Sequence, residues 1–297
     1  MRLMTVRLGD DVEPVLLRGA DELLPLRAGG WSSVRELVEA GEEAWSELEA
    51  GPAWDPIAKL ADVDAVLPPI PQTLRNAMCV GSNYQSHVAE GDRPAGTQAP
   101  PVPVLFSKAW TTFSGHDADI PLHVGRTAKP DWEAEIVVVI GRGGIDIAED
   151  DALDHVFGYA LGNDASARDL QKAAGPLFSQ WFKGKNLDLF GPIGPYVTTA
   201  AEVPDPTVIE VELTVNGVVR QSFCAKDMVN SIGRIVSYLS LGMRLYPGDV
   251  IFTGTSSGVG LWHDPPIFLE DGDVVEITSP QLGVLRNRFV ADPGGST

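Results

Sequence analysis

Hydrophobic positions along this chain recur with two periods, and most segments follow the two-residue period of β-strands. MRLMTVRLG and VEPVLLRG, near the N-terminus, read as short strands. The segment at 208–222, VIEVELTVNGVVRQS, alternates strictly and turns at Asn216-Gly217, a dipeptide typical of two-residue hairpin turns. These patterns predict a strand-rich protein.

Two segments follow the helical period instead. In SSVRELVEAGEEAWSELEAG (32–51), Ser32 or Ser33 is placed to cap the start of a helix and Gly51 its end. DMVNSIGRIVSYLSLG (227–242) predicts a helix with Asp227 as its cap and Gly242 beyond its end. The apolar positions that define these helix faces are Val34, Leu37, Val38, Trp45 and Leu48 in the first, and Met228, Ile232, Ile235, Val236 and Leu239 in the second.

The order of these elements predicts two units. Residues 1–70 form a small N-terminal α+β domain, and the proline-rich stretch LPPIPQ (67–72) leads into a larger domain, residues 71–297. Strands without regularly interleaved helices argue against a doubly wound sheet. We therefore expect a β-rich α+β fold.

Two strands carry glutamates two positions apart, and their surroundings differ. In IEVELTV the face with Glu210 and Glu212 stays polar, which is typical of a half-solvated strand. In DWEAEIVVVI the face with Glu133 and Glu135 continues into valines, and the opposite face is apolar throughout. Two carboxylates that enter a core together need a cation; an Arg or Lys could serve, but a divalent metal fits better if a third oxygen ligand is near. The plain alternative is an exposed strand end.

A third ligand is available in GNDASARDLQKAAG (162–175). Ser166 and Asp169 have the spacing of a capping box, so a helix is expected to start there with Asp169 in a structural role. If the helical turn extends back to Asp164, this residue shares one face with Arg168 and Gln171. Such a face could hold a metal and the carboxylate of an acidic substrate, although a polar helix face is more often only solvated.

His87 and Glu90 lie one helical turn apart in SNYQSHVAE. A carboxylate at that distance can orient an imidazole so that its other nitrogen serves as a base, whereas a lone histidine is more often structural.

GTSSG (254–258) matches the nucleophile elbow of serine hydrolases around Ser256. Prolines follow where that motif needs a helix, and His263 precedes the remaining acids, so we reject the serine-hydrolase interpretation.

The net charge and the cysteine and hydrophobic patterns exclude several classes of function. A formal charge of −19 argues against binding of nucleic acid and of anionic membranes, while a local metal still permits a small acidic substrate. The two cysteines have no CxxC spacing, no signal peptide pattern opens the chain, and no apolar run reaches membrane-span length. A cytoplasmic protein is the expectation.

Taken in order, the motifs VGSNYQSHVAE, DWEAEIVVVIG, GYALGNDASARDLQ, QWFKGKNLDLFGPIGP and YPGDVIFTGTSSGVG make residues 76–290 resemble the fumarylacetoacetate hydrolase superfamily. The resemblance implies a mixed β-sandwich roll, often with a small N-terminal domain and commonly a homodimer. It implies metal ligands at Glu133, Glu135 and Asp164, usually for Mg²⁺ or Mn²⁺. It also implies a catalytic His87–Glu90 dyad with Lys185, and substrate contacts from Arg168, Gln171 and Thr255.

Two positions depart from the family pattern, Asn186-Leu187 after the lysine and Ser256 after the TGT motif. Hard oxygen ligands also favour Mg²⁺ or Mn²⁺ over Zn²⁺ on chemical grounds. The expected reaction is hydrolytic C–C cleavage of a 2,4-dioxo acid, an acylpyruvate or a fumarylacetoacetate-like compound, through an enolate stabilised by the metal. The alternatives are isomerisation or decarboxylation of ring-cleavage products (2-hydroxyhepta-2,4-diene-1,7-dioate type) in aromatic catabolism, oxaloacetate decarboxylation, and a non-catalytic binding protein.

Overall fold

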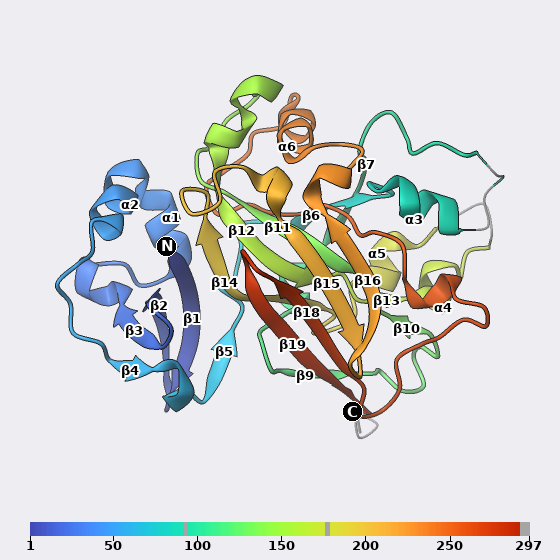
Figure 1. The fold of residues 1–297 in the computed structure, drawn as a ribbon, viewed down its shortest axis with the longest axis horizontal. Coiled ribbons are helices and arrows are strands. Elements are labelled where there is room, and N and C mark those ends of the chain that lie inside the picture. The colour runs from blue at the N-terminus through green and yellow to red at the C-terminus, as the bar shows by residue number, and fades with distance from the viewer. Residues whose placement is uncertain (92–93, 95, 176–178, 292–297) are drawn as a thin grey trace.

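The computed structural model describes residues 1–91, 94, 96–175 and 179–291 (Figure 1). The strands are β1 (Arg2–Leu8), β2 (Asp11–Arg18), β3 (Glu22–Pro25), β4 (Ala58–Lys59), β5 (Ala65–Leu67), β6 (Ala77–Gly81), β7 (Val104–Lys108), β8 (Phe113–Ser114), β9 (Asp119–Pro121), β10 (Pro130–Asp131), β11 (Ala134–Ile140), β12 (Val156–Asn163), β13 (Ser166–Ala167), β14 (Gly191–Thr199), β15 (Glu210–Val215), β16 (Val218–Cys224), β17 (Val250–Phe252), β18 (Val274–Ser279) and β19 (Gly283–Val290). The α-helices are α1 (Val34–Ala40), α2 (Glu42–Glu49), α3 (Gln85–Glu90), α4 (Arg168–Gln171), α5 (Trp181–Lys185) and α6 (Ile232–Ser240). This strand-rich α+β architecture confirms the predicted fold class.

The largest sheet joins the N-terminal strands to the body of the protein. Its order is β4-β3-β2-β1-β14-β12-β11-β17-β6-β7, with β5 paired to β1 and β8 to β14. The junction is antiparallel, with Arg2 opposite Thr198 and Leu3 opposite Val197. The predicted strands near the N-terminus are present as β1 and β2.

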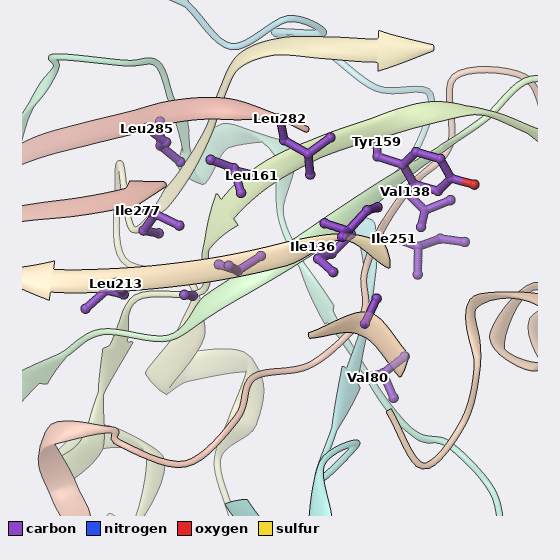
Figure 2. Packing of buried hydrophobic residues seen from close by; sticks show 14 of the residues in the cluster. Val80, Ile136, Val138, Tyr159, Leu161, Leu213, Ile251, Ile277, Leu282 and Leu285 are labelled. Atoms are coloured by element: carbon purple, nitrogen blue, oxygen red, sulfur yellow. The ribbon is translucent and has the colours of Figure 1, made fainter. Parts of the chain in front are cut away.

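A second sheet, ordered β16-β15-β18-β19-β9, packs on the large one and encloses the main core. Figure 2 shows Ile136 and Leu161 of the large sheet among Leu213, Ile277 and Leu285 of the second sheet. On the opposite face of the large sheet, residues of α1 and α2 pack in one cluster with Val137 and Val139 of β11. Because both faces of β11 are covered, all seven of its residues are buried, as its continuous apolar run predicted.

The predicted hairpin at 208–222 is confirmed. β15 and β16 pair through Asn216 and Gly217, whose φ angles of 52° and 76° are both positive, as a mirror-image two-residue turn requires. Glu210 and Glu212 are exposed, while the alternate apolar residues are buried. This glutamate pair is surface charge.

The single helix predicted over 32–51 is wrong. Ser33 caps the start, with its Oγ accepting a hydrogen bond from the Glu36 N–H at 3.0 Å, but the helix breaks at Gly41, where φ is 86° and ψ is −173°. The break lets α2 turn so that the Trp45 ring packs edge-on against Phe157, with 4.9 Å between centroids. A non-glycine residue would resist this backbone conformation.

The cap predicted for the helix at 227–242 is also wrong. Asp227 ends a 3-10 turn (Ala225–Asp227), and α6 begins five residues later, at Ile232. Asn83 explains the difference, because its carbonyl and side chain accept hydrogen bonds from the N–H groups of Val229 (2.8 Å) and Asn230 (2.9 Å). Ser231 is the cap instead. None of the helices in the described residues has the length and apolar character of a membrane span.

Substitution of Ser231 and of Asp227 should show which of the two residues caps α6. Ser231→Ala is expected to lower the free energy of unfolding by about 1 kcal/mol, because the Arg234 N–H loses its 3.1 Å acceptor. Asp227→Ala, at an exposed position, is the matched control and should change stability little. Urea denaturation of the three proteins makes the comparison. A larger loss for Asp227→Ala would contradict the assignment.

Candidate active site

Three carboxylates meet where the start of β11 lies beside the end of β12. The antiparallel register sets Ala134 opposite Asn163, and the Asp164 N–H donates to the Glu133 carbonyl at 2.9 Å. Glu133, Glu135 and Asp164 are all buried, and each offers a ligand oxygen within 4.8 Å of the others. The inward direction inferred for Glu133 and Glu135 is therefore correct, and Asp164 joins them.

Two buried lysines face this cluster. Lys185, at the end of α5, places Nζ 2.5 Å from Glu133 Oε2 and 2.6 Å from Asp164 Oδ2. Lys108, at the end of β7, places Nζ 3.0 Å from Asp164 Oδ1 and donates to the carbonyls of Lys185 and Phe190. Sequence reasoning missed Lys108. A lysine in the apolar context LFSKAW was the signal that could have identified it.

The pKa values of Glu133 and Glu135 are shifted in opposite directions. Burial raises the pKa of Glu133, but the charges of Lys185 and Arg168 outweigh it and hold this pKa at about 2. Burial, with the charges of Asp164 and Glu133, raises the pKa of Glu135 well above its ordinary value. Glu135 accepts a hydrogen bond from the Gly254 N–H at 2.7 Å. In the part of the chain that the structure describes, Lys185 pairs with Glu133 and Asp164, and Glu135 forms no ion pair.

The donor set fits a hard divalent cation. All three ligands are carboxylates, and the group contains no histidine or cysteine. Mg²⁺ and Mn²⁺ prefer such oxygen ligands, and their charge would offset the repulsion that raises the pKa of Glu135. These residues could thus hold a divalent metal.

Arg168 and Gln171 lie on the short helix α4, next to the carboxylates. The Arg168 Nε donates to Asp131 Oδ2 at 2.7 Å, Nη2 forms an ion pair with Glu133 Oε1 at 2.7 Å, and Nη1 contacts Gln171 Oε1 at 3.3 Å. Asp131 was missed by sequence reasoning. Its place two positions before Glu133, on the same side of an extended segment, could have revealed it.

The helix start proposed at Ser166 is wrong. Ser166 lies in β13, which pairs with β10, and its Oγ donates to the Asp164 carbonyl at 2.9 Å. Asp164 lies between β12 and β13, not on a helical face with Arg168 and Gln171. Asp169 is structural as expected, since it accepts hydrogen bonds from Thr127 Oγ1 (2.5 Å) and the Ala128 N–H (2.8 Å).

His87 and Glu90 form the contact that their spacing predicted. On α3, His87 Nδ1 lies 2.6 Å from Glu90 Oε1. The second oxygen of Glu90 accepts a hydrogen bond from the Gly258 N–H at 2.7 Å. Glu90 is therefore fixed by the loop after β17 and can hold the imidazole in one orientation.

The same loop carries Thr255 and Ser256. Thr255 Oγ1 donates to the Ala134 carbonyl at 2.8 Å and accepts from Gln221 Nε2 at 2.8 Å. Ser256 is buried, its Oγ contacts the Ser257 carbonyl at 3.2 Å, and a 3-10 turn (Gly260–Trp262) follows where a nucleophile elbow needs a helix. The rejection of a serine hydrolase is consistent with this local structure.

A cavity of about 160 Å³ unites most of these groups. Phe106, Trp181 and Trp262 add an aromatic wall. Glu90 and Asp164 lie behind the lining, in contact with His87 and Lys185. The predicted site residues that line the cavity are His87, Glu133, Glu135, Arg168, Gln171, Lys185 and Thr255.

Comparison with known proteins matches this geometry to a family. The family model described as fumarylacetoacetate (FAA) hydrolase C-terminal matches residues 76–290. Oxaloacetate tautomerase YisK of Bacillus subtilis (strain 168) is 43% identical over 223 residues, which cover 74% of this chain and 71% of that protein.

Two solved structures share the fold over nearly the whole chain. The fumarylacetoacetate hydrolase of psychrophilic Exiguobacterium antarcticum is 35% identical with a TM-score of 0.83, covering 98% of this chain and 99% of that one. Maleylpyruvate hydrolase from Sphingobium sp. SYK-6, in complex with manganese (II) ion and pyruvate, is 28% identical with a TM-score of 0.78 and the same coverage.

The chain belongs to the fumarylacetoacetate hydrolase superfamily. It is an enzyme of that superfamily, as the sequence predicted. Its relatives include proteins named as tautomerases and as hydrolases, so family membership alone leaves the reaction to be argued from the site.

Proposed function

We propose that this enzyme catalyses metal-dependent enolisation of a small 2-oxo acid, with keto–enol tautomerisation of oxaloacetate as its reaction. The observation that carries the proposal is a small cavity lined by His87, Lys185 and the buried carboxylates Glu133 and Glu135. The 43% identity to a protein named oxaloacetate tautomerase supports the choice of substrate.

Each residue has a task that its contacts support. Mg²⁺ or Mn²⁺, held by Glu133, Glu135 and Asp164, would supply Lewis-acid polarisation of the keto oxygen. Arg168 and Gln171 bind a substrate carboxylate at the cavity wall. The fixed positive charge of Lys185 stabilises negative charge that develops on the keto oxygen.

The proton transfer falls to His87. Its Nδ1 is held by Glu90, which leaves Nε2 as the base that takes a proton from C3 of oxaloacetate. The proton taken from C3 is returned to the keto oxygen as the enol forms, so the reaction is balanced without a co-reactant. The reverse reaction uses the same groups, because one proton moves between carbon and oxygen.

C–C hydrolysis of a 2,4-dioxo acid is the second candidate. The His87–Glu90 dyad could equally take a proton from water, which would attack the distal carbonyl and release an enolate. The likeness to a maleylpyruvate hydrolase in complex with manganese and pyruvate favours this reaction. Both candidates share the enolate and differ in what His87 deprotonates.

Two assays separate the candidates. The decay of enol-oxaloacetate absorbance, followed with Mg²⁺, with Mn²⁺ and with EDTA, is expected to accelerate only with metal. Cleavage of a panel of acylpyruvates is measured in parallel. Cleavage without accelerated tautomerisation would replace the first proposal by hydrolysis, and inactivity in both assays would contradict enolisation of these substrates.

A further inference from the structure

Asp131 is a fully buried carboxylate outside the three-carboxylate cluster. Its Oδ2 accepts hydrogen bonds from Arg168 Nε at 2.7 Å and from the Leu261 N–H at 3.0 Å. Its Oδ1 accepts from the N–H groups of Gly260 (2.7 Å) and Trp132 (2.8 Å). A buried carboxylate with four donors is held in one orientation, and so are its partners.

The loop at 258–261 receives a second anchor from the base dyad. Glu90 accepts a hydrogen bond from the Gly258 N–H while it holds His87. At Gly260 an added Cβ would lie 2.0 Å from the Ile267 carbonyl oxygen and 2.7 Å from Asp131 Oδ1. The loop backbone therefore packs closely on Asp131, and the loop connects Arg168 with the His87–Glu90 dyad.

Arg168 has two competing carboxylates. Glu133 attracts Nη2 at 2.7 Å, whereas Asp131 binds the neighbouring Nε, also at 2.7 Å. A planar guanidinium held at Nε cannot rotate freely, so its Nη1 edge stays beside Gln171 at the cavity. Without Asp131, Arg168 would be free to pair more fully with Glu133.

We propose that Asp131 is a positioning residue, which fixes the Arg168 guanidinium for the substrate carboxylate by tying it to the loop at 258–261. This inference rests on the proposed role of Arg168 in binding the 2-oxo acid. Asp131 itself does not line the cavity and acts through Arg168.

Oxalate binding measured by calorimetry with Mg²⁺ tests the inference without turnover. Asp131→Asn keeps the size of the side chain but removes the charge, and is expected to weaken oxalate binding by about tenfold or more. In kinetics KM should rise more than kcat falls. Asp169→Asn is the matched control, because Asp169 also accepts hydrogen bonds from main chain and hydroxyl groups, and its oxalate affinity should equal that of the wild type.

A double-mutant cycle separates positioning from a structural role. In the Arg168→Met background the effect of Asp131→Asn on oxalate affinity should disappear, since there is no guanidinium left to position. An equal loss in both backgrounds, or wild-type affinity in Asp131→Asn, would overturn the inference. If the wild type itself does not bind oxalate with Mg²⁺, the proposed function fails instead.

A second variant covers the case in which Asp131→Asn does not fold. Asp131→Glu keeps the charge but displaces the carboxylate by one methylene group. It should bind oxalate several-fold more weakly than the wild type, again only where Arg168 is present. Unchanged affinity in Asp131→Glu would count against a positioning role.

Discussion

Replacement of Glu135 by glutamine is expected to lower metal-dependent turnover by about 10³-fold, because the proposed metal site would lose one of its three carboxylates and with it several kcal/mol of charge stabilisation. Glutamine keeps an oxygen acceptor for the Gly254 N–H, so the local backbone is preserved. Steady-state kinetics and Mn²⁺ titration measure the effect. Glu212→Gln, in the exposed glutamate pair of β15, is the matched control and should leave both unchanged.

In the metal-free protein, the same substitution should raise stability at pH values above the ordinary glutamate range. Burial and two neighbouring carboxylates raise the pKa of Glu135, so the native state binds a proton more tightly than the unfolded state does. Stability therefore falls as pH rises from the ordinary glutamate range toward the raised pKa. Glu135→Gln should remove this decline, and thermal unfolding in EDTA across pH checks it. A steeper decline in the variant would contradict the assignment.

Replacement of His87 by alanine is expected to lower kcat by about 10²- to 10⁴-fold, the usual contribution of a positioned general base. Metal binding should survive, because His87 is not among the three carboxylates proposed to hold the metal. Turnover and Mn²⁺ affinity, measured on the same variant, separate a role of His87 in proton transfer from a role in metal binding.

The control for His87 is another histidine with a hydrogen-bonded ring. His155 Nδ1 contacts the Arg142 carbonyl at 2.8 Å, and the residue is not part of the cavity lining, so His155→Ala should retain activity. The activity of Glu90→Gln should fall between those of His87→Ala and His155→Ala. This variant keeps an acceptor for the Gly258 N–H but loses the charge beside the imidazole. A fully active His87→Ala enzyme would remove His87 from the mechanism.

Local patterns predicted the parts of this fold that depend on neighbours in sequence. The hairpin at 208–222 followed from alternation and Asn216-Gly217, and the inward direction of Glu133 and Glu135 followed from the apolar strand behind them. The dyad of His87 and Glu90 followed from helical spacing. In each case the local pattern and the tertiary structure agree.

The missed features depend on partners distant in the chain. The contact of Asn83 with Asn230, 147 residues apart in sequence, moved the cap of α6 from Asp227 to Ser231. Pairing of β13 with β10 overrode the capping pattern at Ser166. Lys108 and Asp131 acquire their roles only when β7, α4 and the loop at 258–261 assemble around the carboxylates. Sequence spacing cannot encode such contacts locally.

Enolisation itself can be measured most directly with pyruvate in D₂O, by NMR of its methyl protons. The proposed tautomerisation requires the protein to move a proton at the carbon beside a keto group. We predict methyl proton exchange in the presence of Mg²⁺ or Mn²⁺, none with EDTA, and a large loss in His87→Ala. Metal-dependent binding of pyruvate without any exchange would contradict enolisation as the chemistry of this site.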